Sequence, residues 1–229
     1  MGEVQVPADA LYGPQTQRAV DNFNIASRTM PLAFVHNLAR IKSAAASANA
    51  ALGRLEPDLA AAIEQAASEV AAGQYDTQFP VGVFQTGSGT SSNMNMNEVL
   101  ARVASQHSGR QVHPNDHVNC SQSSNDVIPA CIQVSASTAL ERQLLPAMRQ
   151  LSQALEQRGA ELDTTVKTGR THLMDAMPLT FGQELATWAF QLAECGQRLA
   201  ELEPRLRSLP SGGSAVGTGV NVPPGFADA

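Results

Sequence analysis

The chain has 229 residues, of which 43% are hydrophobic, 16% charged and 4% aromatic, and its formal net charge at pH 7 is −6. This length is enough to bury the core of one large domain or two smaller ones. The acidic balance argues against a nucleic-acid surface, which needs clustered Lys and Arg, and no apolar run approaches the roughly 20 residues that span a membrane.

The first half of the chain is predicted to form helices joined by polar loops. Residues 2–29 carry a weak pattern interrupted by proline and glycine, which predicts an extended arm. Apolar residues at helical spacing, bounded by prolines and glycines, then predict helices over 31–52, 57–72 and 94–108. Residues 85–93 are dense in Gly, Ser, Thr and Asn and are predicted to be a loop.

Two long amphipathic segments dominate the second half. Apolar residues keep returning to one side over 124–155 and over 179–209, which predicts two helices of about 45 Å each. Pro146 lies deep inside the first and is expected to bend it or to break its hydrogen bonding locally. Pro204 is expected to disturb the last turns of the second. Neither helix can bury its apolar stripe alone, so both are expected to pack in a bundle.

No alternating strand pattern of useful length and no internal repeat accompanies these helices. The predicted fold class is therefore all-α. We expect a small N-terminal helical domain with substrate-binding loops over residues 1–120, and the first part of a central long-helix bundle over residues 121–229.

Polar segments interrupt this helical scaffold at four places. They are Thr86–Asn93, His113–Asp116, Ser121–Asp126 and Gly169–His172. The last of them comes just before the second long helix, which places His172 at the junction between a loop and that helix. Three of the four are predicted to lie at a helix N-terminus, where free backbone N–H groups and the helix dipole favour an anion. Hydroxyls and amides supply hydrogen-bond donors without net charge. This chemistry suits the binding of a small dicarboxylate by an acidic protein.

Each segment also has a purely structural interpretation. Ser, Thr and Asn before a helix are ordinary N-caps, and capping alone explains most such clusters. Gly87-Ser88-Gly89 lacks the lysine of a phosphate loop and is no GxSxG nucleophile elbow. Residues 212–219 have no preceding strand and no lysine, so they are not a phosphate loop either. They are predicted to be a flexible inter-helix loop.

Two further histidine interpretations are weaker. His113 and His117 have a spacing that chelates zinc on a continuous helix, but Pro114 makes such a helix doubtful, and no metal is predicted. His172 with Asp175 and a serine would make a hydrolase triad, although nothing in the sequence fixes that geometry.

The cysteines and the N-terminus predict a compartment. Cys120, Cys131 and Cys195 are odd in number and form no CxxC pair, which fits a reducing environment. The opening MGEVQVPADALYG lacks the basic and apolar regions of a signal peptide. We therefore expect a cytoplasmic protein.

Five motifs together resemble one known family. TGSGTSSNMNMNEV (Thr86 to Val99), HPND with SQSSND (His113 to Asp126) and GRTHLMDAMPLT (Gly169 to Thr180) resemble the class II fumarase branch of the fumarase/aspartase superfamily. GGSAVGTG and the opening VPADALYGPQTQRAV are also similar to that branch. Two positions resemble fumarases more than aspartases. Thr171-His172 looks like fumarase, because aspartases have Thr-Gln there. Aspartases also tend to have Gly-Ala-Gly-Thr where this chain has Gly87-Ser88-Gly89-Thr90.

The resemblance implies a substrate site for fumarate and L-malate. The residues implied to bind carboxylates and hydroxyl are Ser88, Gly89, Thr90, Ser123, Ser124, Asn125 and Thr171. His172 is implied to be catalytic, in proton and water transfer at the hydroxyl-bearing carbon, since imidazole titrates near neutrality. A peripheral dicarboxylate site is implied at Arg110, His113, Asn115 and Asp116.

The implied reaction is the reversible trans hydration of fumarate to L-malate in the tricarboxylic acid cycle, without a cofactor. A base removes a C3 proton from malate, and the resulting charge moves into the adjacent carboxylate, where donors at helix ends stabilise it. Family active sites combine three subunits of a homotetramer. The chain lacks the family's loop resembling GSSIMPGKVNP, so we expect it to be truncated and to turn over malate poorly or not at all. The alternatives are an aspartase-like ammonia-lyase and a non-catalytic scaffold or remnant.

Overall fold

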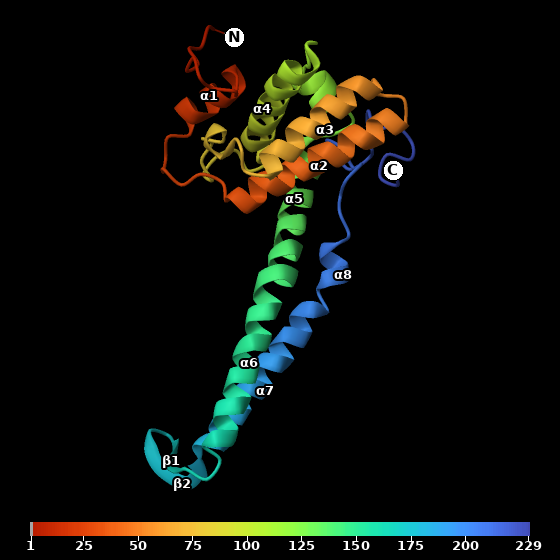
Figure 1. The fold of residues 1–229 in the computed structure, drawn as a ribbon. Coiled ribbons are helices and arrows are strands. Elements are labelled where there is room, and N and C mark those ends of the chain that lie inside the picture. The colour runs from red at the N-terminus through yellow and green to blue at the C-terminus, as the bar shows by residue number, and fades with distance from the viewer. Residues whose placement is uncertain (1) are drawn as a thin grey trace. The chain divides into compact units, whose positions relative to one another are not determined.

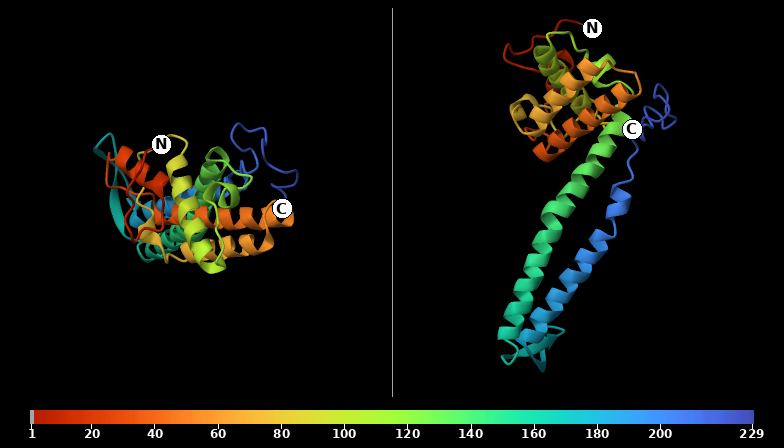
Figure 2. Two further views of the ribbon diagram at one scale, coloured as in Figure 1. Left: turned by 90° about the horizontal axis from the view of Figure 1, so that it is seen from above. Right: turned by 45° about the vertical axis from the view of Figure 1, so that its right-hand side comes forward.

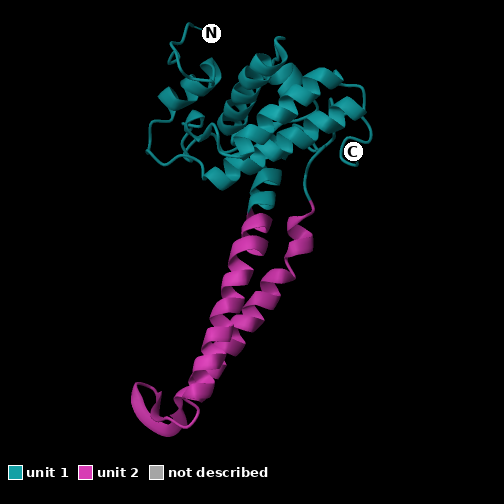
Figure 3. Cartoon of the chain, in the orientation of Figure 1, with its two compact units in different colours: residues 1–135, 209–229 teal, residues 136–208 magenta. Residues whose placement is uncertain are grey.

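The computed structural model describes residues 2–229, and the chain divides into two compact units (Figures 1 and 3). Unit 1 comprises Met1–Ser135 and Leu209–Ala229, and unit 2 comprises Ala136–Ser208. The domain boundary expected after residue 120 does not coincide with the limits of these units, and it stays a prediction.

Unit 1 is built from helices packed around one apolar core. Its elements are α1 (Pro14–Asn22), α2 (Leu32–Ala51), α3 (Pro57–Ala71), the 3₁₀ turn η1 (Asp76–Gln78), α4 (Thr90–Ser108), the π-helical turn η2 (Pro114–Val118) and most of α5 (Ser124–Ala139). Helices α2 and α3 lie side by side in each view (Figures 1 and 2), and α3 also packs on α4. Many core positions are alanines, whose small side chains let the helix backbones approach closely. The larger fully buried apolar residues are Leu38, Ile63, Val70, Met96, Val99, Leu100, Val103 and Val118. The predicted helices over 31–52, 57–72 and 94–108 are thus confirmed, except that α4 begins earlier than predicted, at Thr90, so that residues 90–93 of the predicted loop are helical.

Helix α1 corrects the prediction of an extended arm over residues 2–29. The buried carboxylate of Glu98 accepts the N–H groups of Gly13, Gln15 and Thr16 at 2.9, 3.0 and 3.0 Å, and the Thr16 hydroxyl at 2.6 Å. A carboxylate at a helix N-terminus satisfies free N–H groups and complements the dipole. This partner lies more than 80 positions away along the chain, so the sequence could not reveal it. The local signal that the prediction missed is Pro14 at the first helical position.

Unit 2 is a pair of helices with a β-hairpin between them. Its elements after the end of α5 are the π-helical turn η3 (Leu140–Leu144), α6 (Leu145–Glu161), β1 (Val166–Thr171), β2 (Met174–Thr180), α7 (Phe181–Ala200) and α8 (Glu203–Leu206). Helices α6 and α7 pack against each other (Figure 2). Gly182 permits close packing there, because a Cβ on it would lie 2.8 Å from the Gly159 carbonyl oxygen.

The prolines in the long segments act as predicted. The π-helical turn η3 directly precedes α6, which carries Pro146 in its first turn. Because proline has no N–H and its ring crowds the preceding turn, the regular α-helical hydrogen bonding is interrupted there. The second long helix ends at Ala200, and the short α8 with Pro204 follows.

The hairpin is the main departure from the sequence prediction. Strands β1 and β2 pair antiparallel, from Val166 opposite Thr180 to Thr171 opposite Met174. No residue of the hairpin is buried: most are exposed, and Lys167, Gly169, Leu179 and Thr180 are half-buried, so no apolar face marks its strands. The all-α fold class is confirmed apart from this small sheet. Among residues 2–229, no helix combines the length and apolarity needed to cross a bilayer.

Candidate functional site

Three hydroxyl side chains meet where α4 and α5 begin. The Ser88 and Thr90 hydroxyl oxygens are 2.8 Å apart, and the Thr90 and Ser124 hydroxyl oxygens are 2.9 Å apart. Thr90 is the first residue of α4, and Ser124 is the first residue of α5. Two helix N-termini and three hydroxyls therefore converge in unit 1. We call Ser88, Thr90 and Ser124 the hydroxyl cluster.

Capping does not account for the hydroxyl cluster, although it accounts for a neighbour. The N-cap of α4 is Gly89, which has no side chain, so neither Ser88 nor Thr90 caps that helix. Ser123, by contrast, accepts the N–H of Asn125 at 3.3 Å, and its own N–H donates to Asp126 at 2.9 Å. Ser123 is therefore the residue whose side chain caps α5, and Asp126 satisfies the N–H of Ser123. The hydroxyl cluster is thus exposed or half-buried polar surface that helix capping does not require.

Gly89 is needed for two reasons. Its φ of 66° lies in the left-handed region, and a Cβ would lie 2.9 Å from the Ile128 Cγ2 atom. We expect Gly89→Ala to lower the free energy of unfolding by about 2 kcal/mol, because it adds backbone strain and a steric clash. Gly87→Ala is the matched control, since nothing lies within 4 Å of a Cβ there. Urea unfolding of both variants tests this; equal stabilities would contradict it.

The glycine-rich segment 212–219 is attached to the start of α5. The Asn125 side-chain amide donates to the Ala215 carbonyl oxygen at 2.7 Å. The buried Asp126 carboxylate accepts the Ser214 N–H at 2.9 Å. The sequence predicted a flexible loop here, but it is held at two points beside Ser124.

The structure also contains a buried lysine that lies outside the four polar segments. Lys42 in α2 has no exposed surface. Burial lowers the pKa of its ammonium group from 10.5 to about 7, and the charges of Asp126 and Cys131 oppose this shift in part. Burial likewise raises the pKa of the Cys131 thiol to about 12, so this cysteine is no candidate nucleophile. The one sequence signal was a lone lysine in the alanine-rich run of α2.

Thr171 and His172 lie in the hairpin of unit 2, not at a helix N-terminus. His172 and Leu173 form its two-residue turn, with φ values of 50° and 62°. Two consecutive left-handed residues are what a tight hairpin turn requires, and histidine tolerates this region better than most residues. Helix α7 begins at Phe181, and Thr180 and Gln183 form its capping box. The expected junction between loop and helix at His172 is therefore wrong.

The structure does not support a hydrolase triad at His172. Asp175, the acid considered for it, faces Arg170 across the hairpin, with its Oδ1 atom 3.4 Å from the arginine Nε. All of these side chains are exposed.

The four residues of the predicted peripheral site form hydrogen bonds or ion pairs with one another or with Glu56. Arg110 is paired with Glu56 at 2.7 Å. The His113 Nδ1 atom accepts the N–H groups of Asn115 and Asp116 at 3.3 and 3.1 Å, so His113 caps η2. The Asp116 carboxylate lies 3.1 Å from the same nitrogen. Whether these residues bind a dicarboxylate stays a prediction.

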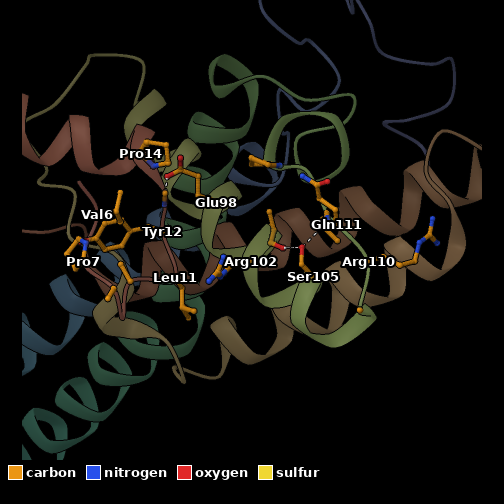
Figure 4. A pocket seen from close by; sticks show the side chains of 17 residues that line it. Val6, Pro7, Leu11, Tyr12, Pro14, Glu98, Arg102, Ser105, Arg110 and Gln111 are labelled. Atoms are coloured by element: carbon orange, nitrogen blue, oxygen red, sulfur yellow. Dashed lines mark hydrogen bonds between the residues drawn. The ribbon is translucent and has the colours of Figure 1, made fainter. Parts of the chain in front are cut away.

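A hollow of about 760 Å³ lies in unit 1 between the N-terminal arm and the C-terminal half of α4 (Figure 4). Tyr12, Glu98 and Arg102 contribute to its wall, as does Arg110. In the part of the chain that the structure describes, none of the hydroxyl cluster lines it. Over the same residues, no three His, Cys, Asp or Glu side chains gather in a way that could hold a metal ion.

Comparison with known proteins supports the resemblance found in the motifs. The family model described as Lyase matches residues 2–229. "Fumarate hydratase class II" of Xylella fastidiosa (strain Temecula1) is 54% identical over 226 residues, which are 99% of this chain and 48% of that protein. "Fumarate hydratase class II 2" of Pseudomonas aeruginosa is 51% identical over 228 residues, covering 100% of this chain and 50% of that protein.

Solved structures agree. The crystal structure of recombinant class II fumarase from Schistosoma mansoni matches with a TM-score of 0.95 and 42% identity, covering 99% of this chain and 49% of that one. The predicted resemblance to class II fumarases is confirmed. The chain spans about half the length of the curated relatives it matches.

Proposed function

The chain belongs to this lyase family, and on that premise we propose that the protein is a fumarate hydratase that interconverts fumarate and L-malate. The observation that carries the proposal is the hydroxyl cluster, where the N-termini of α4 and α5 and three uncharged donors converge. Such an arrangement binds a carboxylate without adding net charge to the site. Its residues belong to the motifs TGSGTSSN and SQSSND, through which the chain resembles class II fumarases.

The hydroxyl cluster suits the difficult step of the reaction. Removal of a C3 proton from L-malate places extra negative charge on the neighbouring carboxylate, and loss of hydroxide then gives fumarate. Donors that are already oriented stabilise this charge at little reorganisation cost. We propose that Ser88, Thr90 and Ser124 bind the substrate carboxylates together with Gly89, Ser123, Asn125 and Thr171. In the same proposal His172 transfers a proton at the hydroxyl-bearing carbon.

We further propose that the active protein is a homotetramer and works in the cytoplasm. Unit 2 exposes large apolar side chains on α6 and α7, including Leu151, Trp188 and Phe190 at 51%, 48% and 66%. Apolar surface of this kind favours association with other helices. The three free cysteines suit a reducing compartment.

A chimera tests the activity. In this protein, which we call the chimera, residues 2–229 replace the matching half of the Xylella fastidiosa fumarate hydratase. We expect the chimera to convert L-malate to fumarate, measured by the ultraviolet absorbance of fumarate. The 229-residue chain alone is expected to show little or no turnover.

The same assays separate the alternatives. A chimera that releases fumarate from aspartate faster than from malate would identify an ammonia-lyase, since the site must distinguish an amine from a hydroxyl. A chimera that assembles but acts on neither substrate would favour a scaffold. Rapid turnover by the 229-residue chain alone would contradict the expectation that it needs further residues.

A further inference from the structure

Lys42 is costly to bury, and packing alone does not explain it. Its side chain has no exposed surface, in a helix whose neighbouring core residues are mostly alanine and other apolar residues. Moving an ammonium group out of water costs several kcal/mol unless it is well paired. Met or Leu would fill the same volume without that cost. The position therefore calls for a role that needs the nitrogen.

The contacts of Lys42 lead to Asn119. The lysine Nζ donates to the Asn119 Oδ1 atom at 2.9 Å, and this oxygen also accepts the Asn93 amide of α4 at 3.1 Å. Because this oxygen accepts two hydrogen bonds, the orientation of the Asn119 side-chain amide is fixed. Its Nδ2 atom accordingly donates to the Gln122 carbonyl oxygen at 3.2 Å.

Gln122 is the residue before the proposed substrate-binding run Ser123–Asn125. Its carbonyl is held by Asn119, and the next N–H, that of Ser123, is held by the buried Asp126 carboxylate at 2.9 Å. Both sides of that peptide bond are thus anchored, one by the half-buried Asn119 amide and the other by the buried Asp126 carboxylate. Through Asn93, the same asparagine is tied to the first turns of α4, which carries Thr90.

We propose that Lys42 is a positioning residue of the substrate site: through Asn119 it fixes the backbone that presents Ser123, Ser124 and Asn125, and it ties this backbone to α4. The proposal rests on the proposed function for its effect on turnover. Its structural part concerns this chain alone. Protonated and neutral lysine can both donate to Asn119, so removal of the nitrogen is the decisive change.

The chimera gives the kinetic test. Lys42→Met is expected to lower kcat/KM by about 10- to 100-fold, because small misplacements of binding groups have effects of this size. Ile63→Val is the matched control: Ile63 is equally buried but lies outside the network, and we expect kcat/KM to stay within about twofold. Asn119→Ala should resemble Lys42→Met, and the double variant should be no worse than Asn119→Ala alone. Additive losses would show that Lys42 does not act through Asn119, and an unchanged kcat/KM in Lys42→Met would overturn the proposal.

NMR of the 229-residue chain separates this proposal from the proposed function. The backbone amide signals of residues 123–125 should shift in Lys42→Met and not in Ile63→Val, whether or not the chimera is active. If Lys42→Met does not fold, a pH titration of the unaltered chain replaces it. The chain has only two lysines, Lys42 and Lys167, so their side-chain carbon signals are readily resolved. The amides of residues 123–125 should then titrate in step with Lys42. If the amide signals of residues 123–125 responded to neither the substitution nor the titration, the positioning role of Lys42 would be overturned. An inactive unmodified chimera would count only against the proposed fumarate hydratase activity.

Discussion

His172→Asn in the chimera is expected to lower kcat by about 10²- to 10⁴-fold, the range typical of a lost general acid or base. Asparagine tolerates the left-handed backbone that His172 adopts, with a φ of 50°, so the hairpin turn should persist. It retains hydrogen-bonding capacity but cannot transfer a proton near neutral pH. The loss should therefore fall mainly on kcat rather than on KM. Steady-state rates of malate dehydration and fumarate hydration, measured across neutral pH, test this.

Leu173→Asn is the control, because Leu173 is the other residue of the same turn, with a φ of 62°, and has no acid–base group. It imposes the same substitution on the same backbone conformation. We expect its kcat to stay within about threefold of the unmodified chimera. Equal losses in the two variants would assign the effect to the turn rather than to the imidazole, and a His172→Asn variant with full kcat would exclude His172 from catalysis.

Much of the helical fold was predictable because the signal was local. Helices α2, α3 and α4 have apolar residues at helical spacing, and prolines or glycines mark their ends. Elements stabilised by distant partners were harder to predict. Helix α1 has a local start signal in Pro14, but Glu98, whose carboxylate satisfies its free N–H groups, is far away in sequence. The hairpin β1–β2 has no buried residue, so no alternation of apolar and polar residues marked it.

The candidate site divides in the same way. The sequence predicted that Ser88, Thr90 and Ser124 lie at helix N-termini, because glycine, serine and asparagine precede a helical pattern of apolar residues. The structure brings these three side chains together. The placement of His172 at a helix N-terminus failed, because the polar run before α7 forms a hairpin and Thr180 caps the helix instead. Lys42 could not be recognised, since its significance lies in Asn119 and Asp126, which the sequence alone does not place beside it.

Because Lys42 is buried, the stability of unit 1 should increase as pH rises, whereas a lysine in a stabilising ion pair would lose its contribution as pH rises. Burial lowers the pKa of the folded-state ammonium to about 7, from an ordinary value of 10.5. Between these values the unfolded chain binds a proton that the folded chain does not bind. The free energy of unfolding therefore rises with pH across this window, by up to about 1.4 kcal/mol per pH unit. The penalty is fully present below pH 7 and has vanished above 10.5.

Lys42→Met supplies the reference, because it keeps every other titrating group. From about pH 7 to about pH 9, the unaltered chain should gain roughly 2 kcal/mol of stability relative to Lys42→Met. The charged groups that act on Lys42 are Asp126 and Cys131, both on α5. Burial raises the pKa of the Cys131 thiol from 9.0 to about 12, which destabilises the fold only as pH rises above 9. The unaltered chain and Lys42→Met should therefore be compared only up to about pH 9.

Two measurements decide the matter independently. Urea unfolding of unit 1, followed through NMR signals of core residues such as Ile63 and Val70, gives the stability difference at each pH. Titration of the Lys42 side-chain carbons gives its folded-state pKa directly, for comparison with the ordinary value of 10.5. If Lys42 titrated at the ordinary value of 10.5, or if the stability difference from Lys42→Met did not change with pH, its ammonium would be solvated or fully compensated. In that case the buried nitrogen would carry no energetic cost, and the reason for assigning it a role beyond packing would be lost.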